Sequence, residues 1–150
     1  MNFGLKSDAL MGELLNYLDI ALGVVSEGAS VFTKNISKYN QLEKNIGREV
    51  KIRADRELND VLGEKLRERT SFNIISEEDD NNNIRENEYN WILDPLDGSF
   101  NYLRGIPIYC ISLGLWKGLE PVLGVVCDLL PPIKTWKCDE EKDIHNKILN

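Results

Sequence analysis

The chain has 150 residues, of which 18 are basic and 25 acidic, so its net charge is −7, and 42% of its residues are apolar. This composition is that of one folded domain, residues 1–150, with enough apolar residues for a core, and it excludes a disordered chain. The acidic balance argues against nonspecific nucleic-acid binding, because it leaves no basic stripe to neutralise phosphates. A small phosphorylated substrate remains compatible, since bound cations can reverse the local charge.

The cysteines and the N-terminus bear on the cellular compartment. Cys110, Cys127 and Cys138 are odd in number and lack CxxC spacing, so they predict neither a disulfide framework nor a zinc site. The N-terminus lacks the basic and long apolar segments of a secretory signal, and no apolar run approaches membrane-spanning length. We therefore expect a cytoplasmic protein with no membrane partner.

Two helices are expected in the first part of the chain. The first is predicted over residues 7–32, because apolar residues recur there at helical spacing, and its buried stripe comprises Leu10, Leu14, Leu15, Leu18, Ala21, Leu22 and Val25. The polar segment 33–47 is expected to be a connection and 49–54 a short extended segment. A second helix is expected over 55–69.

The rest of the chain is expected to form mainly strands. β-branched and aromatic runs predict strands over 72–75, 91–93, 108–116 and 121–129, the last two as an antiparallel hairpin, with a short helix over 99–103 and an edge strand over 133–136. Helices first and adjacent strands later predict an α+β fold, with helices packed on one face of a largely antiparallel sheet.

Two carboxylates follow the strand over 91–93. Asp94 and Asp97 lie in a turn that can bring both side chains to a cation, and the Leu96 carbonyl can join them. Gly98 and Ser99 open the expected short helix, whose backbone N–H groups could face an anion. The alternative is ordinary turn chemistry, with Asp97 capping that helix.

Glu77 and Asp55 could add further oxygen ligands. Glu77 directly follows the strand over 72–75, and carboxylates gathered at strand ends are costly unless cations neutralise them. Glu77 could instead begin a solvated acidic loop. Asp55 could be a first-turn helix residue stabilised by the helix dipole. The residues alone leave these alternatives open.

The segment Trp-Ile-Leu-Asp-Pro-Leu-Asp-Gly-Ser-Phe-Asn-Tyr, residues 91–102, resembles the signature of the inositol monophosphatase family. The wider superfamily includes fructose-1,6-bisphosphatases and bisphosphate nucleotidases. The resemblance covers about residues 49–126 and includes the Ala54-Asp55 and Ser76-Glu77-Glu78 elements in the right order. It implies the N-terminal half of a layered α/β sandwich, with the C-terminal half absent.

The resemblance also implies roles for individual residues. Magnesium would be bound by oxygen atoms of Glu77, Asp94, Leu96 and Asp97. The substrate phosphate would meet Asp97, Gly98 and Ser99. Catalysis would depend on Asp55, Glu77 and Ser99, with Asp55 orienting a further metal or its water and Ser99 positioning the attacking water.

The implied activity is Mg²⁺-dependent hydrolysis of a small phosphate monoester, such as an inositol monophosphate or a sugar phosphate, by a metal-activated water. The alternatives are a 3′(2′),5′-bisphosphate nucleotidase and a noncatalytic remnant that acts as an interaction module. Without a C-terminal half, we expect weak Mg²⁺ binding and low or absent turnover. We also expect an exposed apolar face that favours self-association, of which a homodimer is one form.

Overall fold

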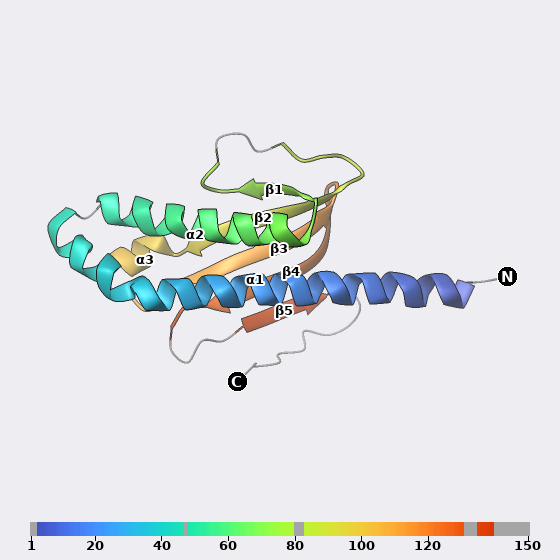
Figure 1. The fold of residues 1–150 in the computed structure, drawn as a ribbon, viewed down its shortest axis with the longest axis horizontal. Coiled ribbons are helices and arrows are strands. Elements are labelled where there is room, and N and C mark those ends of the chain that lie inside the picture. Colours follow the sequence, from blue (N-terminus) through green and yellow to red (C-terminus); the bar gives the residue numbers. More distant parts are fainter. Residues whose placement is uncertain (1–2, 47, 80–82, 131–134, 140–150) are drawn as a thin grey trace.

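A computed structural model describes residues 3–46, 48–79, 83–130 and 135–139, with side chains over 10–37, 53–79 and 83–130. The described residues form three helices and five strands, in the order α1 (Phe3–Ile46), α2 (Arg48–Arg69), β1 (Asn73–Ser76), β2 (Tyr89–Asp97), α3 (Ser99–Leu103), β3 (Cys110–Lys117), β4 (Glu120–Asp128) and β5 (Thr135–Asp139) (Figure 1).

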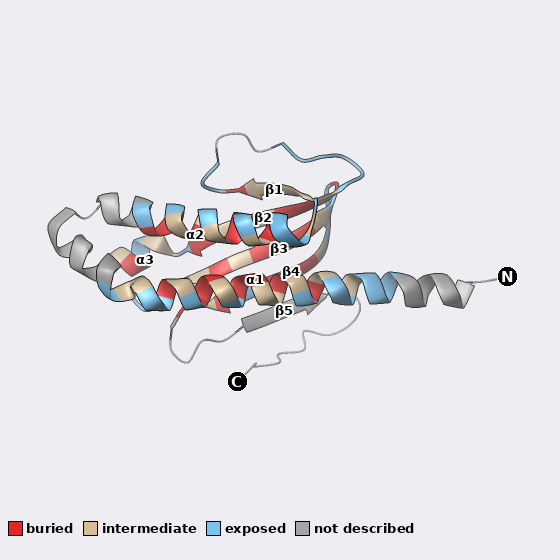
Figure 2. Ribbon diagram, in the orientation of Figure 1, coloured by how far each residue is buried: buried red, intermediate tan, exposed pale blue. Residues whose placement is uncertain are grey.

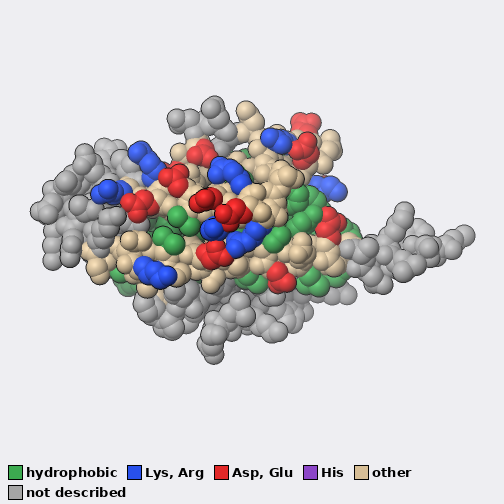
Figure 3. Space-filling view, viewed as in Figure 1, with side chains coloured by type: hydrophobic (Ala, Val, Ile, Leu, Met, Phe, Trp, Pro, Cys, Tyr) green, Lys and Arg blue, Asp and Glu red, His purple; other side chains and the backbone are tan. Residues whose placement is uncertain are grey.

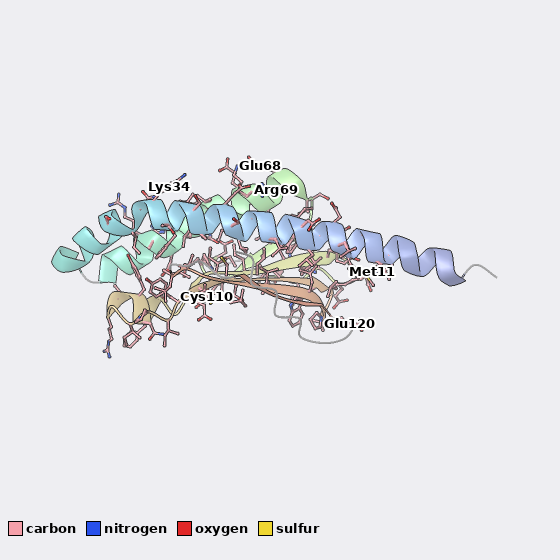
Figure 4. The ribbon with its side chains drawn as sticks, turned by 90° about the horizontal axis from the view of Figure 1, so that it is seen from below. Met11, Lys34, Glu68, Arg69, Cys110 and Glu120 are labelled. Atoms are coloured by element: carbon pink, nitrogen blue, oxygen red, sulfur yellow. The ribbon has the colours of Figure 1, made fainter. Side chains whose placement is uncertain are left out.

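The strands form one mixed sheet in the order β1-β2-β3-β4-β5. The β1–β2 pair is parallel, and each of the other neighbouring pairs is antiparallel. Helices α1 and α2 lie side by side across one face of this sheet (Figures 1 and 4). The predicted α+β fold, with helices packed on a largely antiparallel sheet, is therefore confirmed.

The core lies between the two long helices and the sheet. Figure 2 shows the buried residues along the inner sides of α1 and α2 and on the central strands. Phe32 of α1 is fully buried, and its ring packs edge-on against Tyr102 at a centroid distance of 5.4 Å. Trp91 of β2 is also fully buried, and its Nε1–H donates to Thr70 Oγ1 at 2.9 Å. This hydrogen bond satisfies the indole while its ring fills the core.

The outer side of α1 and α2 faces solvent and carries charges of both signs (Figure 3). Arg69 of α2 pairs with Glu27 of α1, and Lys65 pairs with Glu68 at 2.8 Å. Such exposed pairs contribute about 0–1 kcal/mol each. The charged side of the helices is thus a solvated surface, and the helices' apolar sides supply the core.

One helical segment, Leu10–Ser37, is long and apolar enough to cross a membrane by length and composition. By these criteria the prediction that no apolar run approaches membrane-spanning length is wrong. Its residues Ala21, Val25 and Ala29 are buried in the core with strand residues. The core helix of a folded domain meets the same criteria, and 33% of the most apolar window of this segment is buried.

The first helix is longer than expected. Residues 33–46, predicted as a connection, continue α1, and residues 49–54, predicted as extended, lie inside α2. Beyond Phe32, Ile36 still packs against the core. Asn35 Nδ2 donates to the Val31 carbonyl at 2.9 Å, which satisfies a polar side chain within the helix. At Ile36, packing against the core therefore favours the helix over the connection that the polar composition predicted.

Part of the predicted buried stripe of α1 is exposed. Leu10 and Leu15 are each 52% exposed, whereas Leu18 and Ala21 are buried. The reason is geometric, because the N-terminal end of α1 extends past the sheet (Figure 1). Helical periodicity identifies one side of a helix, and only a neighbouring element decides where that side is covered.

The strands and short helix lie where the sequence predicts them, with shifted ends. The hairpin of β3 and β4 and the helix α3 are confirmed. Strand β2 runs on to Asp97, so it includes the turn that was expected to follow it. The predicted edge strand is β5, although residues 133–134 lie outside the described residues. His145, interpreted as a surface residue, also lies outside them.

Candidate active site

The Asp94–Asp97 segment is an irregular end of β2. Asp94 pairs with Ser112 and Asp97 with Cys110, and the register between them shifts. The Leu96 N–H donates to Asp94 Oδ1 at 3.2 Å, so Asp94 closes a local turn with its own side chain. An irregularity of this kind re-aims side chains at the end of a strand. Here it sets two carboxylates three residues apart at one end of the sheet.

Glu77 reaches the same end of the sheet because β1 and β2 are parallel. Ser76 pairs with Leu93, so Glu77, which directly follows β1, lies beside Asp94 of β2. The Glu77 N–H continues the ladder by donating to the Leu93 carbonyl at 3.1 Å. The carboxyl ends of parallel strands meet at one edge. Two carboxylates from distant parts of the sequence are thereby brought together.

The carboxylates of this cluster interact strongly. The pKa of Asp94 is raised from 3.8 to about 7, first by burial and then by the hydrogen bond with Glu77 and the negative charges of Glu77 and Asp97. The Leu96 N–H acts in the opposite direction. The Asp94 carboxyl therefore keeps its proton to a higher pH than an isolated aspartate does. A divalent cation would relieve this repulsion.

A polar chain fixes the segment that carries Glu77. Ser76 is fully buried, and its hydroxyl donates to Asn59 Oδ1 of α2 at 2.7 Å. Asn59 Nδ2 donates in turn to Asp79 Oδ1 at 3.2 Å, and the Glu78 N–H donates to Ser76 Oγ at 3.3 Å. The loop after β1 is thus tied to α2. Asn59 was not among the predicted site residues, and in the sequence only its position one helical turn after Asp55 points to it.

Gly98 gives the chain the conformation it needs between β2 and α3. Its φ is 81° and its ψ is 23°, which is a left-handed backbone conformation that residues with a Cβ rarely adopt. A Cβ there would lie 2.6 Å from the Ile108 carbonyl oxygen. Ser99 is the first residue of α3, directly after the two aspartates. The predicted phosphate contacts of Gly98 and Ser99 stay predictions.

The capping role considered for Asp97 is wrong. Gly98 is the N-cap of α3, and no side chain caps the helix. Asp97 is exposed and accepts a long hydrogen bond, 3.9 Å, from the Cys110 thiol. The start of α3 therefore does not use the Asp97 carboxylate, and the metal-binding role of Asp97 stays a prediction.

Asp55 is not a first-turn residue, because α2 begins at Arg48. It lies inside the helix, is only 3% exposed, and follows the fully buried Ala54. Helix α2 packs against both β2 and α3. Burying a carboxylate is costly without compensation, which favours a specific role over a solvated one. Whether Asp55 joins the Glu77–Asp94 cluster remains a prediction.

A second group missed by the sequence analysis lies beside Asp97. Asp97, Cys110 and Asp128 line a hollow of about 390 Å³ at the end of β3 and β4. The pKa of the Cys110 thiol is raised to about 11, first by burial and then by the charges of Asp97, Asp94 and Asp128. Cys110 is therefore a protonated thiol and a poor nucleophile at neutral pH.

The donor set of the site fits a hard cation. Glu77, Asp94 and Asp97 offer carboxylate oxygens, the ligand type that Mg²⁺ and Ca²⁺ prefer. Within residues 10–37, 53–79 and 83–130, no three His, Cys, Asp or Glu side chains are arranged as a complete metal site. The structure thus brings Glu77 and Asp94 into contact with Asp97 nearby, without gathering the whole predicted ligand set.

Comparison with known proteins gives the family. The inositol monophosphatase family matches residues 14–146, and the chain belongs to that family. A relative from Aquifex aeolicus (strain VF5), named fructose-1,6-bisphosphatase/inositol-1-monophosphatase, is 29% identical over 124 residues, which are 77% of this chain and 45% of the relative.

Solved structures show the same fold. Inositol monophosphatase II from Staphylococcus aureus MSSA476 superposes with a TM-score of 0.71 at 17% identity, over 89% of this chain and 49% of that one. A structure described as inositol monophosphate bound SaIMPase-II gives a TM-score of 0.64 at 19% identity, over 93% of this chain and 48% of that one. The chain spans about half the length of the relatives that it matches.

Proposed function

We propose that this chain carries the metal-binding and phosphate-binding part of a Mg²⁺-dependent phosphatase that hydrolyses a small phosphate monoester. The observation that carries the proposal is the contact between Glu77 and Asp94, with Asp97 near enough to raise the pKa of Asp94. Carboxylates held in mutual repulsion are stabilised by a hard divalent cation. Family membership supports the same chemistry.

In this proposal Mg²⁺ is held by Glu77, Asp94, the Leu96 carbonyl and Asp97, and it supplies charge neutralisation and a water of lowered pKa. The irregular end of β2 preorganises Asp94 and Asp97, so little reorganisation is required during reaction. The segment from Asp97 through Gly98 to Ser99 holds the substrate phosphate.

The remaining roles concern the attacking water. Asp55 and the Ser99 hydroxyl would orient that water toward the substrate phosphate, and Glu77 would act with them as a catalytic residue. Asp55 is buried in α2, which packs against the short helix that begins at Ser99. This packing supports a shared role for the two side chains.

The substrate class follows from the relatives. SaIMPase-II is described with inositol monophosphate bound and, in another structure, with 2′AMP bound. The first ligand supports an inositol monophosphate or sugar phosphate, and the second keeps the nucleotidase alternative in the test. Both ligands carry one phosphate on a ring hydroxyl. A cytoplasmic location is part of this proposal, and cell fractionation tests it.

The test is phosphate release from a panel of inositol monophosphates, sugar phosphates and adenosine bisphosphates, with and without Mg²⁺. Asp94→Asn removes the central carboxylate, and Asp60→Asn is the matched control because Asp60 is an exposed carboxylate of α2. We expect slow Mg²⁺-dependent release that Asp94→Asn abolishes and Asp60→Asn preserves. Release that survives Asp94→Asn would exclude the proposed site.

Mg²⁺ binding separates a weak enzyme from a noncatalytic remnant. Calorimetric titration should detect Mg²⁺ binding that is lost in Asp94→Asn and kept in Asp60→Asn. Binding without release from any substrate would favour the remnant. Release from adenosine bisphosphates alone would favour the nucleotidase. Absence of both binding and release would contradict the proposal for this chain.

A further inference from the structure

The main chain around Glu77 is held by a series of hydrogen bonds. The Glu77 N–H donates to the Leu93 carbonyl of β2 at 3.1 Å, and the Asp79 N–H donates to the Ser76 carbonyl at 3.1 Å. Between these two, the Glu78 N–H donates to Ser76 Oγ at 3.3 Å. Three consecutive N–H groups, those of residues 77–79, thus have acceptors, and two of these acceptors belong to Ser76.

The Ser76 hydroxyl links this segment to α2. The Ser76 side chain is fully buried, and its Oγ donates to Asn59 Oδ1 at 2.7 Å. The Asn59 amide is oriented in turn, because its Nδ2 donates to Asp79 Oδ1 at 3.2 Å. Asn59 therefore bridges Ser76 and Asp79, which are the residues on the two sides of Glu77 and Glu78. One side chain of α2 closes a ring of hydrogen bonds around the segment that carries Glu77.

Helix α2 also carries Asp55, one turn before Asn59. Residues four apart lie on the same face of a helix, with a rise of about 6 Å between them. Asp55 is buried, whereas Asn59 is partly buried and reaches the end of β1 at Ser76. Helix α2 packs against both β1 and β2. The same helix thus holds one predicted catalytic side chain and contacts the strand end that carries another.

We infer that Asn59 is a positioning residue of the proposed Mg²⁺ site, because it fixes the main chain of Glu77 through the Ser76 hydroxyl. This inference rests on the proposed function, in which Glu77 is a metal ligand. Glu77 is exposed and lies against Asp94, a group of like charge. Little packing holds an exposed side chain, so its fixed main chain supplies the constraint. Removing the hydrogen-bond partners that hold metal ligands weakens metal binding by about 10–100-fold.

Two substitutions each break the link between β1 and α2. Ser76→Ala removes the hydroxyl, and Asn59→Leu keeps nearly the shape of the side chain without its donor and acceptor. Calorimetric titration should show Mg²⁺ binding about tenfold weaker in each variant than in the unchanged chain. Asn73→Leu is the matched control, because Asn73 of β1 donates to the Asn83 carbonyl at 2.8 Å and to Asn90 Oδ1 at 2.9 Å. It removes the same amide from the other end of β1 and should leave the Mg²⁺ affinity unchanged.

Exchanging the amide and the carboxylate at positions 59 and 79 tests the hydrogen bonds directly. The double variant Asn59→Asp, Asp79→Asn keeps an acceptor for the Ser76 hydroxyl and keeps an amide–carboxylate pair at the same two positions. Its net charge equals that of the unchanged chain and of Asn59→Leu, so charge does not account for a difference in Mg²⁺ affinity. The double variant should bind Mg²⁺ as the unchanged chain does. Binding as weak as that of Asn59→Leu would contradict the assigned hydrogen bonds.

Amide hydrogen exchange measured by NMR without Mg²⁺ reports the link independently of metal binding. The Glu78 N–H should exchange about tenfold faster in Ser76→Ala and Asn59→Leu than in the unchanged chain, and at the same rate in Asn73→Leu. If the unchanged chain bound no Mg²⁺, the proposed function would fail, and the exchange rates would still decide whether Asn59 fixes this segment.

The outcomes that overturn the inference are separate from those that overturn the proposed function. If the unchanged chain bound Mg²⁺ and folded Ser76→Ala and Asn59→Leu bound it equally well, Asn59 would have no positioning role. An equal weakening by Asn73→Leu would also overturn the inference, because it would show a general loosening of β1. Thermal unfolding of each variant shows that the compared chains are folded.

Discussion

Removing the Asp94 carboxylate should stabilise the metal-free chain at alkaline pH. In the folded chain the pKa of Asp94 is raised from 3.8 to about 7 by burial, by its hydrogen bond with Glu77 and by the neighbouring negative charges. Below pH 4 the carboxyl is protonated in both the folded and the unfolded chain. Between pH 4 and pH 7 the unfolded chain loses the proton first, so folding stability falls as pH rises. Above pH 7 the ionised Asp94 carboxylate lowers the folding stability by its full amount, which we call the penalty.

The size of the penalty follows from the pKa. If the carboxyl were fully shielded from solvent, this shift would lower the free energy of unfolding by about 4 kcal/mol, because each pKa unit corresponds to about 1.4 kcal/mol. Asp94 is only half-buried, so solvent screening reduces this to roughly 1–2 kcal/mol. Asp94→Asn keeps the shape of the side chain and removes the charge. It should therefore raise the free energy of unfolding at pH 8 by that amount and change it little at pH 4.

Urea denaturation followed by circular dichroism, in the presence of EDTA, measures both values. Asp60→Asn serves as the control and should show no such pH dependence. Adding Mg²⁺ at pH 8 should make the unchanged chain more stable than Asp94→Asn. A ligand at 100 times its Kd stabilises a folded chain by about 2.7 kcal/mol. If Asp94→Asn destabilised the chain equally at pH 4 and pH 8, the described repulsion between carboxylates would be refuted.

Three further substitutions test the packing that positions the site. Gly98→Ala forces a Cβ to within 2.6 Å of the Ile108 carbonyl at a φ of 81°, so it should cost about 1–3 kcal/mol in thermal or urea unfolding. Thr70→Val leaves the buried Trp91 N–H without its acceptor and should cost about 1–3 kcal/mol, with a change in tryptophan fluorescence. Phe32→Ala opens the fully buried core and should cost about 3–5 kcal/mol, whereas the exposed Leu15→Ala should change stability by less than about 0.5 kcal/mol. Equal losses at positions 32 and 15 would contradict the described burial.

The elements that could be predicted from the sequence are those specified by short-range chemistry. The hairpin of β3 and β4 follows from two apolar runs separated by four residues, and α3 follows from the Gly98-Ser99 start after the aspartate turn. The extent of α1 could not be predicted from its composition, because residues 33–46 are polar and remain helical. A helix end is decided partly by what packs against it.

The carboxylates and their order along the chain can be read from the amino-acid sequence, and the segment 91–102 indicates the family. The parallel pairing of β1 with β2, which brings Glu77 against Asp94, and the burial of Asp55 inside α2 are properties of the folded chain. The physical reason is that strand pairing and burial join residues far apart in the chain, and local periodicity carries no information about such partners. The placement of both long helices on one side of the sheet likewise depends on contacts between distant segments, which no single segment of sequence encodes.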